Sequence, residues 1–158
     1  MVDRSAAAER DRGSQPALIV SACLLGVHCN HVGGASPSRA VAALAATHRL
    51  IPVCPETAGG LPTPRPASER QPDGTVRTED GTDVTEWYER GAEHTVRLAL
   101  ASGATRAVLK ARSPSCGCEE VYDGTFTRTL VAGEGVTAQA LRLAGVEVVT
   151  EAAVAGGT

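Results

Sequence analysis

The chain has 158 residues, a formal net charge of −3 and five cysteines. Its 42% hydrophobic and 21% charged residues are near the globular average, so we expect one compact domain rather than a disordered chain. The charge argues against broad binding to nucleic acid or anionic membranes, and no apolar run approaches the roughly 20 residues that span a bilayer. One Trp, two Tyr and one Phe are too few for a base-stacking surface.

The five cysteines cannot all pair within the chain, and the N-terminal residues lack the continuous apolar core of a secretory signal. We therefore expect a cytoplasmic protein without a disulfide scaffold. Its reduced thiols would be free to bind metals or act as nucleophiles. The 17 Gly and 9 Pro residues exceed the average, and much of that excess lies beside the cysteines.

Composition divides the chain into three parts. Residues 1–15 are polar and Ala-rich and are expected to form a mobile tail, residues 16–151 a single domain, and residues 152–158 a flexible tail. Pro52 suggests that the strand expected at residues 50–54 lies at a sheet edge or ends near this proline. Short apolar runs bounded by Gly or Pro predict buried strands at residues 17–23, 50–54, 106–110 and 146–150.

Helices are predicted between these strands. Ser36 and Pro37 form a helix start, and this helix would run to about residue 48. Asp83 to Glu86 has capping-box spacing, and an apolar stripe continues that helix to residue 102. A third, shorter helix opens at residues 135–137 and ends at residue 145.

Two segments have no clear periodicity. Residues 55–82 contain five prolines and four glycines and are predicted to form a long stiff loop without regular elements. Residues 121–131 are expected to form either a short hairpin or an irregular excursion. The alternation of strands and helices predicts an α/β fold with a Rossmann-like open sheet, mostly parallel, and helices on both faces.

The strongest indication of chemistry is that three cysteines follow predicted strands. Cys23 ends the first strand, Cys54 ends the second, and Cys116 lies a few residues past the third. Because open parallel sheets bind ligands outside the carboxyl ends of their strands, we expect these thiols to converge. Buried structural cysteines and a zinc site are alternatives, although the paired C-x2-C spacing of structural zinc is missing. An iron–sulfur cluster tolerates widely spaced ligands.

Residues near these cysteines are candidates for catalysis or binding. Glu56 is a candidate acid/base, or it caps a backbone N–H. Ser113 and Ser115 could donate hydrogen bonds to a bound sulfur or carbonyl, or shape a turn. Arg65, between two prolines, could clamp an anionic or carbonyl group, or be a solvated loop charge. The helix start that contains Thr137 is flanked by glycines, so its amides could hold an anion.

Six strings of the sequence can be matched to a known family. They are SACLLG from residue 21, PVCPE from 52, GGLPTPRP from 59, KARSPSCG from 110, YDGTF from 122 and GVT from 135. In this order they resemble the small bacterial domain family that includes thiouracil desulfidase, over residues 17–149. The resemblance implies a 4Fe–4S cluster held by Cys23, Cys54 and Cys116 with one iron free. It also implies removal of sulfur from a thiolated uracil, giving the carbonyl product and hydrogen sulfide.

With this resemblance, Glu56 is expected to act as the acid/base and Ser113 to orient the substrate or the bound sulfur. Arg65, Ser115 and Thr137 are expected to contact the substrate. The expected partner is a small thiolated pyrimidine, and binding to nucleic acid would need a further protein. Two alternatives stay open: a non-catalytic iron–sulfur or metal-binding module that acts as a sensor or carrier, and a desulfurase of thiouridine in tRNA.

One stretch departs from the family pattern. Where the family usually reads Arg-Tyr-Asp-Gly after Cys29, this chain reads NHVG, so that Val32 replaces the acid. If that acid positions substrate or water, the activity or substrate choice of this protein will differ, and His31 could replace it only in part. Cys29 and Cys118 have no expected role.

Overall fold

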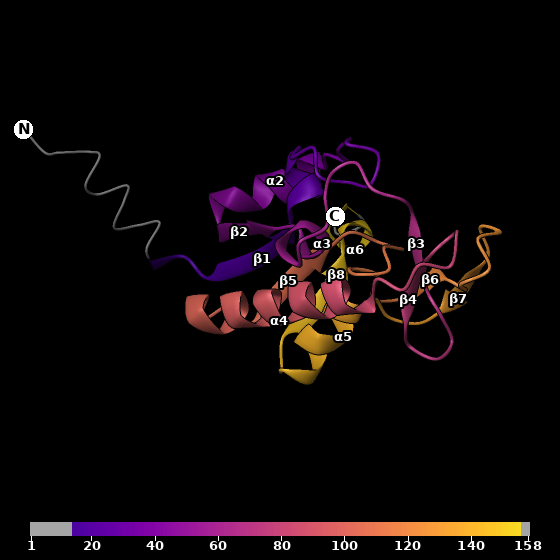
Figure 1. The fold of residues 1–158 in the computed structure, drawn as a ribbon. Coiled ribbons are helices and arrows are strands. Elements are labelled where there is room, and N and C mark those ends of the chain that lie inside the picture. The colour runs from indigo at the N-terminus through magenta and orange to yellow at the C-terminus, as the bar shows by residue number, and fades with distance from the viewer. Residues whose placement is uncertain (1–13, 156–158) are drawn as a thin grey trace, which may run out of the picture.

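A four-stranded parallel sheet forms the centre of the computed structural model, which describes residues 14–155 (Figure 1). The strands are ordered β2-β1-β5-β8, and every pairing is parallel. Their bounds are β1 Ala17–Ser21, β2 Arg49–Val53, β5 Arg106–Leu109 and β8 Glu147–Thr150. The predicted α/β fold with an open, mostly parallel sheet is confirmed. The predicted N-terminal tail lies, up to residue 13, outside the described residues, as do residues 156–158.

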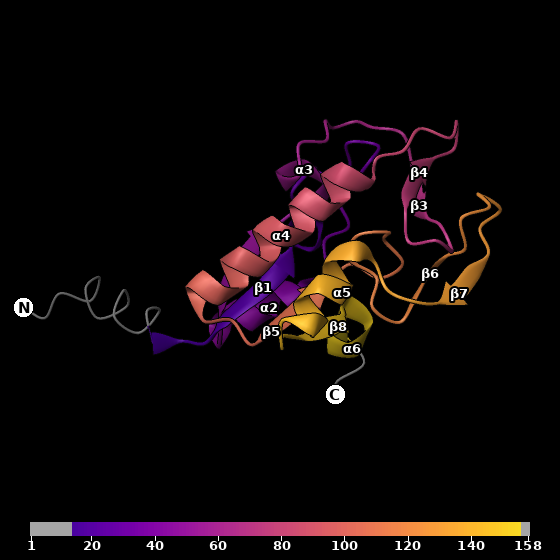
Figure 2. The same ribbon diagram turned by 60° about the horizontal axis from the view of Figure 1, so that its bottom comes forward.

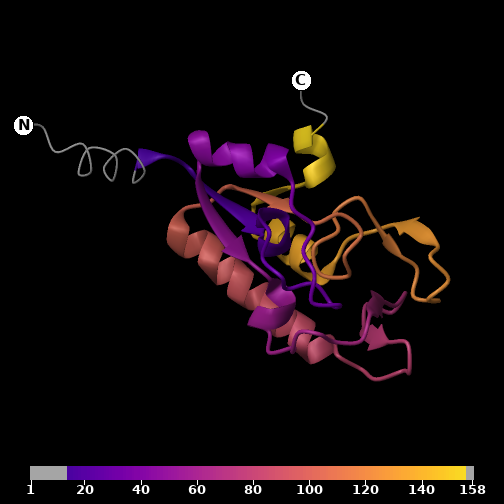
Figure 3. The same ribbon diagram turned by 90° about the horizontal axis from the view of Figure 1, so that it is seen from above.

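Both faces of the sheet are covered, which is why β1 is a continuous apolar run. Leu18 and Val20 pack on the face that holds α2 (Arg39–Ala43) and α6 (Glu151–Ala155). Ile19 packs on the opposite face with α4 (Thr85–Ser102) and α5 (Val136–Leu143). Figure 3 shows α2 and α6 on one side of the strands and α4 on the other. The chain leaves β1 toward β2 on one side and reaches β5 on the other, so the β1–β5 boundary is the topological switch point.

The predicted helices differ from the structure mainly at their ends. The helix expected from Pro37 begins at Arg39, because the side chain of Ser38 accepts the hydrogen bond from the backbone N of Val41 at 3.2 Å. It ends early in the 3-10 turn η2 (Leu44–Ala46). α4 is followed by Gly103, as predicted, and this glycine has the left-handed backbone (φ of 72°) that is typical of a residue that ends a helix. Pro52 lies in β2, an edge strand, as predicted.

The prediction that residues 55–82 contain no regular element is wrong. The short helix α3 (Pro55–Ala58) follows Cys54 at once, and β3 (Ser68–Arg70) pairs with β4 (Val76–Thr78) as an antiparallel hairpin. Pro72 and Gly74 lie in the hairpin turn, where Asp73 accepts a hydrogen bond from the backbone N of Thr75 at 2.9 Å. Proline and glycine here shape the turn instead of excluding strands.

A second hairpin is formed by β6 (Glu120–Tyr122) and β7 (Leu130–Ala132), which confirms the hairpin alternative for this segment. Figures 1 and 2 both show the two hairpins beside each other, beyond the ends of the central strands. Glu69 of β3 accepts hydrogen bonds from the backbone N of Gly124 and of Phe126, at 3.0 and 3.2 Å. The first hairpin thereby fixes the loop of the second.

The chain continues from β8 directly into α6, where the sequence indicated a flexible tail from residue 152. Glu151 holds this helix to the sheet because its carboxylate accepts hydrogen bonds from Lys110 Nζ at 3.0 Å and from the backbone N of Ala111 at 2.8 Å. Within residues 14–155, none of the helices combines the length and apolar character that a membrane crossing requires.

Candidate functional site

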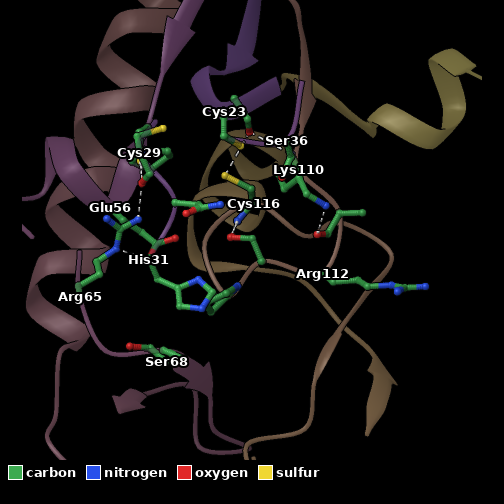
Figure 4. Close-up of a pocket in the computed structure, with 18 of the residues that line it drawn as sticks. Cys23, Cys29, His31, Ser36, Glu56, Arg65, Ser68, Lys110, Arg112 and Cys116 are labelled. Carbon is green, nitrogen blue, oxygen red and sulfur yellow. Dashed lines mark hydrogen bonds and ion pairs between the residues drawn. The ribbon is translucent and has the colours of Figure 1, made fainter. Parts of the chain in front are cut away.

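A cleft of about 810 Å³ opens at the C-terminal ends of β1, β2 and β5 and extends outward between the two hairpins (Figure 4). This position is the switch point of the sheet, where open α/β folds bind ligands. Residues of its inner half are Ser21, Cys23, Cys29, Cys54, Glu56 and Cys116. Residues of its outer half are Ser68, Glu69, Arg112, Tyr122, Phe126 and Arg128.

The structure brings the three predicted cysteines into this one cleft. Cys23 lies in the 3-10 turn η1 (Ala22–Leu25) that directly follows β1. Cys54 is the residue before α3, and Cys116 lies in the loop after β5. Each cysteine is therefore carried by a turn just beyond a strand of the parallel sheet, so its position is tied to the rigid core.

Cys116 is the most buried of the three, with 4% of its surface exposed. The hydroxyl of Ser21 donates to its Sγ at 3.4 Å and itself accepts from the backbone N of Lys110 at 2.9 Å. Ser113 Oγ accepts hydrogen bonds from the backbone N of Ser115 and of Cys116, both at 3.1 Å. These bonds fix the loop that presents the Cys116 thiol.

α5 packs beneath this loop through a glycine. A Cβ at Gly135 would lie 2.4 Å from the carbonyl carbon of Ser115, so only glycine permits this approach. The hydroxyls of Ser115 and Thr137 are fully buried and 2.9 Å apart, and the backbone N of Thr137 donates to the Ser115 carbonyl at 2.9 Å. Neither residue lines the cleft, so the structure does not bring them to the expected substrate position. Their hydroxyls are engaged with each other.

Cys54 and Glu56 are placed by an equally close helix contact. A Cβ at Gly91 of α4 would lie 1.8 Å from the carbonyl oxygen of Pro55, and a Cβ at Gly59 would lie 1.9 Å from that of Trp87. The backbones of α3 and α4 therefore touch with no side chain between them. This contact fixes the start of α3, which carries Glu56 into the cleft.

The carboxylate of Glu56 is held by two buried side chains. Its Oε1 accepts hydrogen bonds from Tyr88 Oη at 2.6 Å and from Arg65 Nε at 3.2 Å. Arg65 Nη2 donates to the carbonyl oxygen of Cys29 at 2.8 Å, and Nη1 donates to two oxygens of residues 62–63. Only 4% of the Arg65 side chain is exposed. Its guanidinium is thus engaged by the protein and is not a solvated loop charge.

Burial controls the acidity of the thiols in the cleft. It raises the pKa of Cys23, which the neighbouring Cys54 raises further and Lys110 lowers. It also raises the pKa of Cys29 and of Cys116, each to about 12. Such thiols stay protonated at neutral pH and make poor free nucleophiles. A thiol becomes a ligand only when a coordinating metal removes its proton.

The donor set is compatible with an iron–sulfur cluster. Among the residues that the structure describes, no group of three or more His, Cys, Asp and Glu side chains could share one metal ion. In a cluster, each cysteine binds a separate iron, so the thiols lie around the group instead of meeting at one atom. The three thiols line one cleft and come from three different strand ends, which is the kind of donor set that such a cluster uses.

The segment that departs from the family pattern lies at the rim. Val32 is 70% exposed and does not line the cleft, whereas His31 does. The carbonyl oxygen of His31 accepts from the backbone N of Arg65 at 2.8 Å. Of the two cysteines without an expected role, Cys118 packs against the core, and the carbonyl oxygen of Cys29 accepts from the Cys54 thiol at 3.7 Å.

The sequence did not identify Tyr88 or Ser21 as site residues. Tyr88 appears in the sequence only as one residue of an apolar helix stripe, and Ser21 as part of a buried strand and the first residue of the SACLLG string. The one indication of a role was their hydroxyl groups, because a buried hydroxyl needs a hydrogen-bond partner. Tyr88 and Glu56 are 32 residues apart, so their pairing depends on the tertiary contact between α3 and α4.

Three comparisons relate the chain to known proteins. The family model described as 2-thiouracil desulfurase matches residues 18–153. The uncharacterised protein YbbK of Bacillus subtilis (strain 168) is 38% identical over 143 residues, which cover 85% of this chain and 95% of that relative. The solved structure of a [4Fe-4S]-dependent thiouracil desulfidase, TudS, is 45% identical. It superposes with a TM-score of 0.84 and covers 90% of this chain and 95% of its own.

Proposed function

The chain belongs to the 2-thiouracil desulfurase family, and from this premise we propose that it is a 4Fe–4S-dependent desulfidase. It would convert the thiocarbonyl of a thiolated uracil-type substrate and water into the carbonyl compound and hydrogen sulfide. The observation that carries the proposal is the presence of three strand-end cysteines and Glu56 in one cleft. The [4Fe-4S] dependence of the solved relative supports the choice of cofactor.

Cys23, Cys54 and Cys116 are the residues that would hold the cluster. When bound through three protein ligands, the cluster supplies an iron with an open position, which is a Lewis acid toward the substrate sulfur. The cleft at this point is lined by Ser21 and Lys110 as well as by the thiols. Ser21 fixes the Cys116 sulfur through its hydrogen bond of 3.4 Å.

Glu56 is the proposed acid/base. Exchange of sulfur for oxygen requires that a water lose protons as it attacks the ring carbon and that the departing sulfur gain them. Glu56 lies in the cleft with Oε1 held by Tyr88 and Arg65. We assign the proton transfers to Oε2, which takes the two protons of the water one after the other and passes each to the departing sulfur.

Ser113 is proposed to orient the substrate. A hydroxyl has one donor and two acceptor positions, and both acceptor positions of Ser113 receive backbone N–H groups. Its O–H hydrogen is therefore left to donate, and Ser113 lines the cleft. That polarity suits the carbonyl or thiocarbonyl of a pyrimidine, which can only accept. Ser115 and Thr137 are proposed to support this loop from beneath instead of touching the substrate.

The proposal is tested by loading the protein with iron and sulfide under anaerobic conditions and measuring about four irons per chain. We expect 2-thiouracil to be converted to uracil, with one sulfide released per uracil formed. Glu56→Gln should keep its iron and retain only a small, still measurable turnover, which separates acid/base chemistry from cofactor binding. If the fully loaded protein releases no sulfide from any thiolated uracil or uridine, the enzymatic proposal fails and a non-catalytic cluster module is favoured.

A further inference from the structure

Two buried side chains converge on one oxygen of Glu56 from different parts of the fold. Tyr88 lies on α4 and is 1% exposed, and Arg65 lies in the segment between α3 and β3. Both donate to Oε1, at 2.6 and 3.2 Å. Figure 4 shows the Arg65 side chain directed toward Glu56. The second carboxylate oxygen is not used in either bond.

The direction of the tyrosine hydrogen bond follows from its surroundings. Burial raises the pKa of Tyr88 above its ordinary value of 10.0, and the negative charge of Glu56 raises it further. The phenol therefore keeps its proton and donates it, while the carboxylate accepts. A buried phenol and a buried guanidinium both need partners, and a single carboxylate oxygen satisfies one donor of each.

Arg65 also connects the carboxylate to the cysteine segment. Its Nη2 donates to the carbonyl oxygen of Cys29 at 2.8 Å, and the same oxygen accepts from the Cys54 thiol at 3.7 Å. One guanidinium plane thus spans from Glu56 to the atom that contacts the Cys54 sulfur. Because a guanidinium is planar and rigid, movement of one end is transmitted to the other.

We infer that Tyr88 and Arg65 are positioning residues that fix Oε1 of Glu56 and so direct Oε2 toward the reacting water. Without them, the carboxylate can rotate about its terminal torsion and present either oxygen at a variable distance. Misplacement of a reacting group by about 1 Å costs on the order of 100-fold in rate. The inference rests on the proposed role of Glu56 as acid/base.

The main test is Tyr88→Phe, which removes the phenol hydroxyl and keeps the ring. We expect kcat to fall by about 10- to 100-fold while KM changes by less than about threefold and iron content is unchanged. Thr95→Val is the matched control, because Thr95 is a fully buried hydroxyl on the same helix that donates to the Gly91 carbonyl. It should lose stability but keep kcat within about twofold of the wild type.

A second measurement separates positioning from a general structural role. If Tyr88 acts through Glu56, adding Tyr88→Phe to Glu56→Gln should cause no further loss, whereas independent structural damage would multiply the two losses. Arg65→Lys should lower both kcat and iron retention, since Arg65 also holds the segment that contacts Cys54. An equal loss from Tyr88→Phe in both backgrounds overturns the inference.

A readout without turnover keeps the inference separate from the proposed function. Subtracting the infrared spectrum of Glu56→Gln from that of the cluster-loaded wild type isolates the Glu56 carboxylate band. This band should shift in Tyr88→Phe and stay in place in Thr95→Val. If it does not shift in Tyr88→Phe, the positioning role is refuted. If it shifts but the wild type releases no sulfide, Tyr88 holds Glu56 and the proposed function is what fails.

Discussion

The inner and outer halves of the cleft are built in different ways. The inner half, with its three cysteines and Glu56, stands on strand ends and on helix contacts that only glycine allows. The outer half stands on two short hairpins, and there the backbone is strained. Arg112, Phe126 and Arg128 have φ of 68°, 58° and 60°. Among the described residues these are the non-glycine residues with positive φ, and all three line the cleft.

This difference predicts how substitutions in each half should affect cofactor binding and stability. The inner half is fixed by the core, so substitution of a proposed cysteine ligand should abolish cofactor binding, and substitution of a glycine at its helix contacts should destabilise the protein. The outer half is fixed by a few hydrogen bonds between the two hairpins, such as those that Glu69 accepts from the second hairpin. Strained backbone of this kind costs about 1–3 kcal/mol per residue and persists where neighbouring structure holds it. Substitutions there should have small effects on stability.

The largest effect is expected from Cys116→Ser. It removes a proposed ligand at a site that is 4% exposed, so we expect loss of the cluster and of turnover. Cys29→Ser is the matched control, because it changes a cleft thiol outside the proposed ligand set and leaves the carbonyl oxygen that Arg65 and Cys54 contact. Iron per chain after anaerobic loading distinguishes them. Equal iron loss in both variants would place Cys29 among the ligands.

Gly91→Ala tests the contact that places Glu56. In an exposed helix, this change gains about 1 kcal/mol of propensity. Here the new Cβ would meet the Pro55 carbonyl oxygen at 1.8 Å, so the overlap dominates and we expect a net loss of about 3 kcal/mol or more. Urea unfolding measures this loss. His94→Ala, on an exposed position of the same helix, should change stability by less than about 0.5 kcal/mol. A stable Gly91→Ala protein would contradict the close packing of α3 on α4.

The buried Tyr88 makes stability depend on alkaline pH. Burial, and then Glu56, raise the pKa of the folded phenol above its ordinary value of 10.0. Above that pH the unfolded chain loses the proton first, so this contribution is present in full below pH 10.0 and is lost as pH rises. Free energies of unfolding measured on both sides of this pH should fall less steeply in Tyr88→Phe than in the wild type. Parallel curves would contradict the burial of the phenol.

The cysteine positions of the inner half could be predicted from sequence because they follow from short, contiguous sequence patterns. A buried run followed by Cys predicts a strand and a thiol at its end, and parallel strands bring such ends together. The strands at residues 17–23, 50–54 and 106–110 needed no distant contact to be recognised. The partners of Glu56 could not be found in this way. Tyr88 and Arg65 reach it only after α3, α4 and the segment before β3 have packed.

The first hairpin of the outer half was missed for a different reason. The prolines and glycines of residues 55–82 predict an irregular loop when they are taken together, although the string from Gln71 to Gly74 is a turn signal between two short strands. Three-residue strands carry too little alternation to be recognised. Their stability comes from contacts such as Glu69 with the loop of the second hairpin. α6 was also missed, because its position depends on a contact that is distant in sequence, between Glu151 and Lys110.

Arg128 allows the strain of the outer half to be measured. Its φ of 60° is left-handed, and its side chain is exposed. Glycine tolerates this conformation, whereas alanine keeps the strain and removes only the side chain. We expect Arg128→Gly to be more stable than Arg128→Ala by about 1 kcal/mol, measured by urea unfolding. If alanine is equally stable or better, the loop is free to relax and the contrast between the two halves is weakened.

The smallest effect is expected from Val32→Asp, which restores the acid of the family pattern. Val32 is 70% exposed and outside the cleft, so the change should alter stability by less than about 0.5 kcal/mol. Sulfide release should stay within about twofold, a barrier change of under ~0.5 kcal/mol. His31→Ala should have the larger effect, because His31 does line the cleft. A gain of about tenfold in Val32→Asp would mean that the rim loop closes over the substrate. The inner half would then be complete only in that closed form, and the rim would belong to the chemistry as much as the strand ends do.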